Sequence, residues 1–378
     1  MASLIQKLRL LQGLLTGEAA FTGPFHVSVD ITCRCNLRCV GCRYHSPGAV
    51  APFPDDQVVK DMSWDMFSRI CGELRALNTR TLFMLGEGEP LLHDRVWDFI
   101  SLAEEKGIKV LLITNGTLLD ERRIECLFSS GLNELQVSLW ACSPENYARQ
   151  YPGTDWSNFH KVVESLKILS RLKKRRASRR PLVKLHHPID RFNYRDVSEM
   201  ADLALSAGCD VISFSPYLTH GQVGEYGLSE DEKEELLRSL RELAKRLESL
   251  PITHNIGRTL LRYGAYTESR MKLPCYAGWY HSRIRVDGTV FPCGCCDTAL
   301  GSLVEKRFGE IWNGEPYRAF RRRAMTAEGL SSLAGSCDCK HCCYAEDTLR
   351  VHRVFRPLAP LVLVLRPDKT VGVQGADG

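Results

Sequence analysis

The chain contains 378 residues, of which 44% are hydrophobic and 25% are charged, and its formal net charge is +5 at pH 7. These values are typical of a globular protein with one large domain and a smaller one, and the mild charge indicates no nucleic-acid partner. The 16 cysteines are many. A secreted disulfide scaffold would be short and would carry a signal peptide, which this N-terminus does not resemble. We therefore expect metal centres in a cytoplasmic protein, and no apolar run approaches the ~20 residues of a membrane span.

Residues 1–24 are expected to form a helical extension before the first strand. Apolar side chains recur there at helical spacing: Leu4, Ile5, Leu8, Leu11 and Leu15. The C-terminal tail, residues 346–378, contains a short apolar segment at 358–365. Either end could contact a membrane surface, but packing against the main domain is the favoured interpretation.

Strand-like and helix-like segments alternate from residue 25 to about residue 225. The predicted strands are His26–Ile31, Thr81–Leu85, Lys109–Thr114, Glu134–Trp140, Leu182–His186 and Val211–Ser215. The predicted helices between them are Trp64–Leu77, Arg95–Lys106, Asp120–Ser129, Phe159–Lys173 and Asp196–Ala207. This order predicts an α/β fold with a parallel sheet, in which reactive groups gather at the carboxyl ends of the strands.

A run of three cysteines, Cys35, Cys39 and Cys42, directly follows the first predicted strand. The Cys-x3-Cys-x2-Cys spacing can bind three irons of a cubane 4Fe–4S cluster, which leaves the fourth iron open to a substrate or cofactor. A pure electron carrier would normally supply four cysteines. The alternative for this run alone is a zinc knuckle or a redox-inert cysteine cluster.

Three further motifs lie at the ends of predicted strands. Gly88-Glu89-Pro90 follows the second strand, Thr114-Asn115-Gly116 ends the third, and Ser138 lies on the fourth. Thr-Asn-Gly alone would be a turn in most proteins. The motifs are informative because of their order and spacing behind the cysteine run.

Together, these motifs resemble those of the radical S-adenosylmethionine (SAM) superfamily. The resemblance implies a partial (β/α)6 TIM-like barrel over residues 25–225, with a 4Fe–4S cluster on Cys35, Cys39 and Cys42 whose open iron chelates the methionine moiety of SAM. It also implies that the cluster cleaves SAM reductively to a 5′-deoxyadenosyl radical, which abstracts a hydrogen atom from the substrate. Such an enzyme needs a reducing electron donor such as flavodoxin or ferredoxin.

The resemblance also assigns SAM contacts. In that family the loop equivalent to Gly88, Glu89 and Pro90 receives the SAM ammonium, and backbone carbonyls suit a cationic amine. The segment at Thr114 and Asn115 and the strand residue Ser138 are the other implied SAM contacts. Glu87 departs from the family's Gly-Gly-Glu-Pro pattern, because it replaces the first glycine.

The C-terminal third contains a second group of cysteines: Cys275, Cys293, Cys295, Cys296, Cys337, Cys339, Cys342 and Cys343. Between the first two, Asp287-Gly288 flanked by β-branched residues predicts a β-hairpin. A hairpin could bring Cys275 and Cys293 together, and Cys339-x2-Cys342 could complete a four-ligand site.

With the segment Gly309-Glu-Ile-Trp-Asn313, this pattern resembles the SPASM auxiliary-cluster extension or its shorter twitch form, and the spacing is similar to that of 2-deoxy-scyllo-inosamine dehydrogenase. The resemblance implies a small β-hairpin plus helix domain over residues 271–345. Its auxiliary 4Fe–4S cluster would be bound by four thiolates: Cys275, Cys293, Cys339 and Cys342. The one-cluster twitch form is favoured, because the Cys-x2-Cys-x5-Cys run of the full form is missing.

Alternative ligand sets stay open for this second group. Four cysteines could substitute as ligands or bind a second auxiliary cluster: Cys295, Cys296, Cys337 and Cys343. A zinc ribbon is the other alternative, since Cys293-x2-Cys296 with Cys339-x2-Cys342 also satisfies tetrahedral zinc.

Residues 226–270 separate the two predicted domains. Ser229 and Glu232 form a capping-box pattern at the start of a helix expected from about Glu230 to Leu250. One apolar stripe runs along it: Leu236, Leu240, Leu243 and Leu247. We expect a packing helix that bridges the two domains, followed by a linker.

These resemblances imply a radical SAM enzyme of oxidoreductase type. The main expectation is net oxidation or other modification of a small polyol- or sugar-like metabolite, because only about 24 residues precede the first strand and no N-terminal peptide-recognition domain is visible. The alternatives are maturation of a peptide side chain, modification of a lipid-linked substrate, or a non-enzymatic iron–sulfur or zinc protein. The sequence identifies neither the substrate, nor the fate of the substrate radical, nor the oligomeric state.

Overall fold

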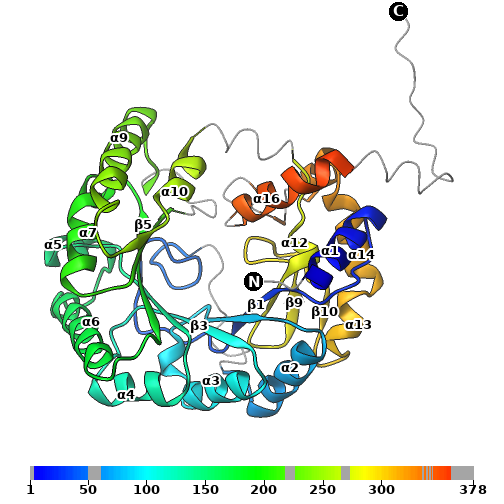
Figure 1. Cartoon of the computed structure of the whole chain (residues 1–378), viewed down its shortest axis with the longest axis horizontal. Coiled ribbons are helices and arrows are strands. Elements are labelled where there is room, and N and C mark those ends of the chain that lie inside the picture. Colours follow the sequence, from blue (N-terminus) through cyan, green and yellow to red (C-terminus); the bar gives the residue numbers. More distant parts are fainter. Residues whose placement is uncertain are drawn as a thin grey trace, which may run out of the picture.

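The computed structural model describes residues 4–49, 61–217, 226–264, 273–333, 336–337, 339, 342 and 344–358. In this part of the chain a ten-stranded sheet curves through the molecule, with helices along its outer side (Figure 1). The strand order is β10-β9-β8-β1-β2-β3-β4-β5-β6-β7. The strands are β1 (His26–Asp30), β2 (Thr81–Leu85), β3 (Lys109–Thr114), β4 (Glu134–Ser138), β5 (Leu182–Ile189), β6 (Val211–Pro216), β7 (Thr253–His254), β8 (His281–Ile284), β9 (Thr289–Phe291) and β10 (Gly301–Ser302).

The helices fall into a barrel set and a C-terminal set. The first set comprises α1 (Leu4–Thr16), α2 (Trp64–Ala76), α3 (Val96–Glu105), α4 (Glu121–Ser129), α5 (Pro144–Gln150), α6 (Ser157–Arg175), α7 (Val197–Ser206), α9 (Glu230–Leu247) and α10 (Ile256–Tyr263). The second comprises α12 (Ala277–Tyr280), α13 (Phe308–Trp312), α14 (Glu315–Ala324), α15 (Ala327–Ser331) and α16 (Ala345–Phe355). Short 3-10 turns are η1 (Pro90–Leu92), η2 (Tyr194–Asp196) and η3 (Arg356–Leu358).

The parallel β/α half of the prediction is confirmed. Strands β1 to β7 pair in parallel, and helices follow them along the chain. β4 ends at Ser138 rather than at the predicted Trp140, because the Trp140 amide leaves the ladder and donates to the Tyr151 hydroxyl at 3.0 Å. β5 continues to Ile189, three residues beyond its predicted end.

Strands β2, β4 and β5 each have one face against the helices and one half-exposed face. On β4, Leu135 and Val137 are fully buried, whereas Gln136 and Ser138 are partly exposed. Because side chains alternate along a strand, this pattern places polar residues on the inner face and the apolar core under the helices. The candidate site therefore lies on the inner face and at the carboxyl ends of the strands.

The predicted C-terminal hairpin is confirmed, and it joins the barrel sheet. β8 and β9 are antiparallel, and Gly288 in their turn has φ +85°, a left-handed conformation that favours glycine. β8 also pairs in parallel with β1, with His281 opposite His26. The auxiliary segment thus begins with the strand that lies next to β1, the strand that precedes the first cysteine run.

Helix α9 begins at the predicted capping box, in which Ser229 accepts from the amide of Glu232 and the Glu232 side chain accepts from Ser229. The helix ends at Leu247, and its apolar stripe is buried. Its main contacts are with α7, η2 and α10. The helix therefore covers the β6 side of the barrel, a placement that differs from the expected bridge between two domains.

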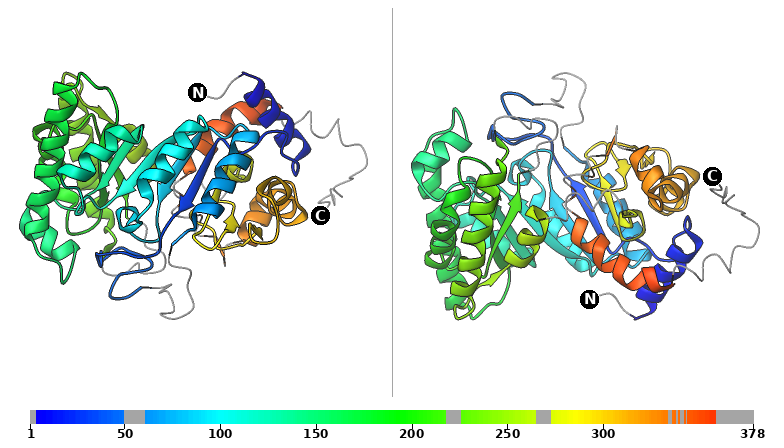
Figure 2. Two further views of the ribbon diagram at one scale, coloured as in Figure 1. Left: turned by 90° about the horizontal axis from the view of Figure 1, so that it is seen from below. Right: turned by 90° about the horizontal axis from the view of Figure 1, so that it is seen from above.

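Helix α1 packs against the main domain, as expected. Gln6 donates to the Asn78 carbonyl at 2.9 Å and accepts from Arg80 Nε at 2.6 Å. α1 lies beside α16 at one end of the molecule, whereas the segment that follows β1 lies at the opposite end (Figure 2). Within the described ranges no helix is long and apolar enough to cross a membrane. Most of the apolar tail segment 358–365 lies outside the described residues.

Candidate active site

The first cysteine run forms a loop at the carboxyl end of β1. The Cys42 amide donates to the Cys39 carbonyl at 2.9 Å, and the Val40 amide donates to the Gln150 carbonyl at 3.0 Å. The Cys42 sulfur accepts from the backbone amides of Tyr44 at 3.4 Å and His45 at 3.2 Å. Backbone amides that point at a thiolate stabilise its charge, as second-shell groups do around metal ligands.

Gly41 has no space for a side chain. A Cβ atom at this position would lie 2.2 Å from the Trp140 ring and 2.2 Å from the Tyr217 ring. These aromatic residues follow β4 and β6, so two strand ends close over the loop. The glycine between Cys39 and Cys42 is therefore a steric requirement of the loop's position.

The three thiols are close enough to influence one another. Burial raises the pKa of Cys35 to about 11 and raises the pKa of Cys39 well above its usual value, and the neighbouring thiols add to both increases. No group of three or more His, Cys, Asp or Glu side chains among the described residues converges on a point that holds one metal ion. A cubane places each thiolate on a different iron, so its cysteines are spaced apart. The donor set and its spacing fit a cluster whose irons supply the charge that buried thiolates need.

The predicted SAM loop is hydrogen-bonded to the cysteine loop. The Gly88 amide donates to the Thr32 carbonyl at 3.1 Å, and the Glu89 amide donates to the Arg34 carbonyl at 2.7 Å. A Cβ on Gly88 would lie 2.0 Å from the Arg34 carbonyl oxygen. Gly88 therefore permits the close backbone approach that brings the two loops together.

The Glu89 carboxylate joins the ends of β2 and β3. It accepts from Thr114 Oγ1 at 2.6 Å, from the Asn115 amide at 2.7 Å and from the Leu91 amide at 3.0 Å. Burial raises the pKa of Glu89, and these three donors oppose that increase. The Glu89 side chain therefore pairs with other groups of the protein. An ammonium ligand would instead meet the backbone carbonyls of this loop.

The Thr114–Asn115 segment also reaches the cysteine loop. Asn115 Nδ2 donates to Asn36 Oδ1 at 2.9 Å, and Asn36 Nδ2 donates to Thr117 Oγ1 at 2.8 Å. Ser138 lies in register with His186 of β5, at the same end of the sheet. The structure therefore brings together the predicted cluster ligands and the loops predicted to bind SAM, while the individual ligand and SAM contacts stay predictions.

His186 is a candidate site residue that sequence reasoning missed. Its Nδ1 lies 2.8 Å from Ser213 Oγ and its Nε2 lies 3.2 Å from Ser215 Oγ, both on β6. Burial lowers the pKa of His186 to about 3, so the ring is neutral at physiological pH. The available signal was the spacing of Ser213 and Ser215, two residues apart on β6. This spacing places both side chains on the same face of the sheet as His186 of β5 and Ser138 of β4.

Glu87, the departure from the family pattern, is the second missed residue. Its buried carboxylate accepts from Arg283 Nη2 at 2.9 Å and from Arg285 Nη2 at 2.9 Å, both in the segment that begins at β8. Arg283 Nε also donates to Asp30 Oδ2 at 2.7 Å. Asp30 ends β1, so this buried network connects the cysteine strand, the SAM loop and the auxiliary segment.

Several auxiliary cysteines lie close enough to interact electrostatically. Burial raises the pKa of Cys293 well above its usual value, with Cys295, Cys342 and Cys275 as further electrostatic causes. Cys275, Cys293 and Cys342 are three of the four predicted ligands, and the ligand set stays a prediction. Cys339 donates its amide to the Cys337 carbonyl at 2.9 Å.

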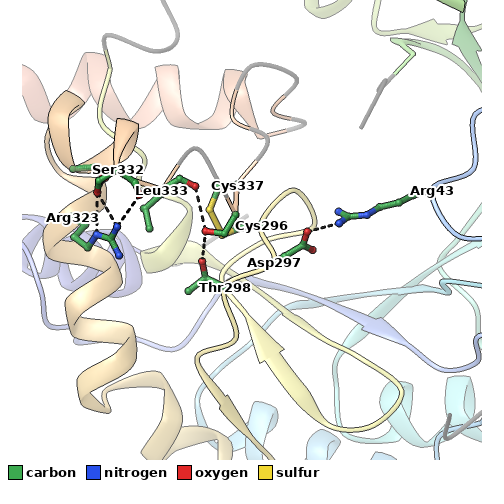
Figure 3. The surroundings of a disulfide bond; sticks show 10 residues. Arg43, Cys296, Asp297, Thr298, Arg323, Ser332, Leu333 and Cys337 are labelled. Carbon is green, nitrogen blue, oxygen red and sulfur yellow. Dashed lines mark hydrogen bonds and ion pairs between the residues drawn. A yellow bond between two sulfur atoms is a disulfide. The ribbon is translucent and has the colours of Figure 1, made fainter. Parts of the chain in front are cut away.

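Two of the alternative ligands are bonded to each other. Cys296 and Cys337 form a disulfide (Figure 3). Arg43, next to Cys42, forms an ion pair with Asp297, so the two cysteine segments are in contact (Figure 3). Cys343 lies outside the described residues.

Comparison with known proteins gives two matches in the same order along the chain. Residues 29–204 match the model of the radical SAM superfamily, and residues 275–343 match that of an iron–sulfur cluster-binding domain, SPASM. An AdoMet-dependent heme synthase of Methanosarcina barkeri is 25% identical and covers 86% of this chain and 91% of its own. A PqqA peptide cyclase of Gluconobacter oxydans is 25% identical and covers 84% of this chain and 86% of its own.

Solved structures show the same fold. Streptococcus suis SuiB bound to precursor peptide SuiA has a TM-score of 0.63 at 17% identity and covers 90% of this chain and 76% of its own. The protein anSMEcpe with bound AdoMet has a TM-score of 0.60 at 15% identity and covers 92% of this chain and 100% of its own. Such domains imply SAM and 4Fe–4S clusters, including an auxiliary cluster. The chain belongs to the radical SAM superfamily and carries a C-terminal SPASM domain.

Proposed function

We propose that this radical SAM enzyme modifies a peptide, in an oxidoreductase-type reaction that begins with hydrogen abstraction from a side chain. This proposal adopts the alternative from the sequence analysis in place of the small polyol-like metabolite expected there. The observation that carries it is that peptide cyclases are similar to this chain across both domains, over 84–86% of its length. Structural similarity to SuiB, solved with its precursor peptide SuiA, covers 90% of this chain and supports the same substrate class.

The open sheet supports a large substrate. In the part of the chain that the structure describes, β7 and β10 are the edge strands and the sheet does not close on itself. The cysteine loop lies at the carboxyl ends of the strands, where β/α barrels bind their ligands. A polymer can approach such a site from the side, whereas a closed barrel admits only what fits its mouth.

The chain's own residues provide the means to position SAM and a polar substrate. We infer that Cys35, Cys39 and Cys42 bind the cluster, while the backbone around Gly88 and the Asn115 segment hold SAM beside it. SAM bound at a reduced cluster supplies the 5′-deoxyadenosyl radical that removes the hydrogen atom. Position matters most for this chemistry, because a misplacement of ~1 Å can cost about 100-fold in rate.

The inner face of β4 to β6 suits a peptide group. Both nitrogens of neutral His186 pair with Ser213 and Ser215, and the hydroxyl groups of these serines and of Ser138 keep further capacity to donate or accept. A peptide bond needs both a donor and an acceptor, so this face can pair with a backbone or with a polar side chain. The same hydroxyl groups also suit a ribose, so the assignment of Ser138 to SAM is compatible with this role.

The experiment compares two classes of substrate. Anaerobically reconstituted protein is incubated with SAM, dithionite and one of two fractions of the cells that produce it. The polypeptide fraction contains molecules of about 1–10 kDa and the metabolite fraction those below about 1 kDa, so that peptides are separated from sugars. We expect the polypeptide fraction to raise 5′-deoxyadenosine formation, and proteinase K treatment of that fraction to abolish the increase. A Cys35, Cys39 and Cys42 triple alanine variant is the matched control. Stimulation that resides in the metabolite fraction and resists protease would overturn the peptide proposal and restore the small-molecule one.

A further inference from the structure

A second surface with unusual properties lies at the amino ends of the strands. It is formed by α1, α16 and the beginnings of β1, β2 and β3, and we call it the α1–α16 face. Figure 2 shows α1 and α16 side by side at the end of the molecule opposite the segment that contains the cysteine loop. None of the described residues that line the hollows of this face is predicted to bind SAM or a cluster.

The α1–α16 face exposes large apolar side chains. The exposed fractions are 72% for Leu4, 64% for Ile5 and 56% for Leu8 on α1, and 67% for Val354 on α16. A groove of about 550 Å³ runs between the two helices. Its apolar lining is Leu10, Leu11, Leu14, Phe25, Val351, Val354 and Phe355. Contiguous exposed apolar surface of this kind marks an interaction site in a soluble protein.

Basic side chains surround this apolar surface. A second hollow of about 580 Å³ lies on the other side of α1 and shares Phe25 and His26 with the groove. The described residues that line it include four bases and no acid: Arg9, Arg75, Arg80 and Lys109. The groove adds Lys7, one acid, Asp347, and Arg350, which forms an ion pair with Glu346. The α1–α16 face therefore combines an apolar centre with a positive margin.

We propose that the α1–α16 face binds the surface of a membrane that contains anionic phospholipids. Leu4, Ile5 and Leu8 would enter the boundary between headgroups and acyl chains, and the bases would contact headgroup phosphates. A helix that lies in the interface in this way combines buried apolar area with attraction to anionic lipid. This inference is independent of the proposed peptide substrate.

Charge and shape distinguish this partner from two others. A second copy of the chain would bring the same six bases against one another, because a two-fold interface pairs each patch with itself. A peptide would bind within the hollows, whereas two strongly exposed residues, Leu4 and Ile5, protrude from α1. A membrane at this face would leave the cysteine loop directed away from the lipid (Figure 2). The packing of α1 against the main domain, which the sequence favoured, is compatible with this because only its outer face is exposed.

The test uses the reconstituted full-length protein and sedimentation with vesicles. Vesicles of phosphatidylglycerol and phosphatidylcholine should bind the protein, vesicles of phosphatidylcholine alone should bind it at least about tenfold more weakly, and about 0.5 M salt should weaken the first interaction. The combined variant Leu4→Ser, Ile5→Ser and Leu8→Ser should weaken binding to anionic vesicles at least about tenfold. The charge variant Lys7→Glu with Arg9→Glu should do the same.

Val304→Ser is the matched control, because Val304 is 71% exposed and lies on the auxiliary segment instead. This control should bind anionic vesicles like the parent. Circular dichroism and 5′-deoxyadenosine formation establish that the α1 variants are folded. The proposal is overturned if anionic vesicles do not bind the parent, if folded α1 variants bind as tightly as the parent, or if Val304→Ser weakens binding equally. It is also overturned if the α1 substitutions abolish self-association or polypeptide binding and leave vesicle binding unchanged.

Discussion

Single residues determine how closely the loops of the active site approach one another. Gly41 lies under two aromatic rings, and Gly88 lies against the Arg34 carbonyl. Both positions leave no room for a methyl group, so the cysteine loop and the SAM loop depend on backbone-to-backbone packing. Asn36 and Asn115 then add side-chain hydrogen bonds between the same loops.

Gly41→Ala should disrupt the cluster site without unfolding the barrel. The new methyl group would overlap the Trp140 and Tyr217 rings, which must move the loop and with it Cys39 and Cys42. We expect lower iron content and a loss of about 100-fold in 5′-deoxyadenosine formation, since displacement of catalytic groups by ~1 Å has effects of this size. Iron analysis and a SAM cleavage assay measure both.

Gly72→Ala is the control for this substitution. Gly72 lies in α2, and a Cβ there meets no atom within 4 Å. Because alanine is a better helix former than glycine by about 1 kcal/mol, this variant should be as stable as the parent or more stable. Normal iron content and SAM cleavage in Gly41→Ala would show that the steric account of the loop is wrong.

Arg283 is the other residue on which several elements depend. Its side chain is 8% exposed and pairs with Asp30 and Glu87, whose side chains are 0% and 1% exposed. Burial raises the pKa of Asp30 to about 6, and the charge of Arg283 opposes that increase. A buried carboxylate pair of this kind requires its cation.

Arg283→Met should therefore lower the free energy of unfolding by about 3–5 kcal/mol, the cost of leaving buried charges unpaired. Arg285→Met is the comparison, because the Arg285 side chain is 31% exposed and Glu87 would keep Arg283. That variant should lose only about 1 kcal/mol, because solvent screens a partly exposed pair. Denaturant titrations compare the two, and equal losses would contradict a central role for Arg283.

At the scale of elements, β1 and β8 bring the two cysteine segments together. The first cysteine run follows β1, and β8 pairs with β1 and leads through β9 to Cys293. The Arg43–Asp297 ion pair adds a direct contact between the loops. This arrangement places the auxiliary cysteine segment next to the loop of the first cysteine run.

Reconstituted protein should contain about eight irons and eight sulfides per chain, as two cubane clusters require. Changing Cys35, Cys39 and Cys42 together to alanine should leave about four irons and abolish SAM cleavage, because the auxiliary cysteines are separate. Iron and sulfide analysis with electron paramagnetic resonance measures this. Stoichiometric zinc with about four irons would contradict the auxiliary cluster, and about twelve irons would indicate two auxiliary clusters.

At the scale of the whole molecule, three histidines are held in the neutral form. His187 and His281 are fully buried and His186 is partly buried on the inner face. Desolvation lowers the pKa of each to about 3. The unfolded chain binds these protons at the ordinary histidine pKa, near 6.5. The native state therefore loses stability as pH falls from about 6.5 toward 3, while raised carboxyl pKa values such as that of Asp190, about 6, act in the opposite direction.

His187→Phe should reduce this acid sensitivity by one proton. His187 is fully buried and stacks with Phe214, so a phenyl ring fits the same surroundings. Relative to the parent, the free energy of unfolding of the variant should improve by about 1.4 kcal/mol for each pH unit below 6. Urea titrations at pH 7, 6 and 5 measure this, with exposed His160→Phe on α6 as the control. A difference that does not change with pH would refute the buried, neutral state of His187.

The amino-acid sequence by itself determined the local and periodic features. The alternation of strands and helices predicts the parallel barrel, because hydrophobic spacing follows the geometry of each element. The spacing of Cys35, Cys39 and Cys42 also predicts a cluster locally, because three thiolates on one short loop need no distant partner. The Asp287-Gly288 turn is likewise local, because its left-handed backbone conformation requires glycine.

Only the tertiary structure decided what depends on distant residues. It placed β8 against β1, Glu87 against Arg283, and His186 between two serines, pairings that join residues far apart along the chain. It also placed α9 beside α7, and none of the described elements covers the outer face of α1. No short sequence pattern encodes such pairings, because each depends on the packing of several elements at once. For this chain the cofactor chemistry is therefore local in the sequence, whereas the coupling of its two cysteine sites is a property of the fold.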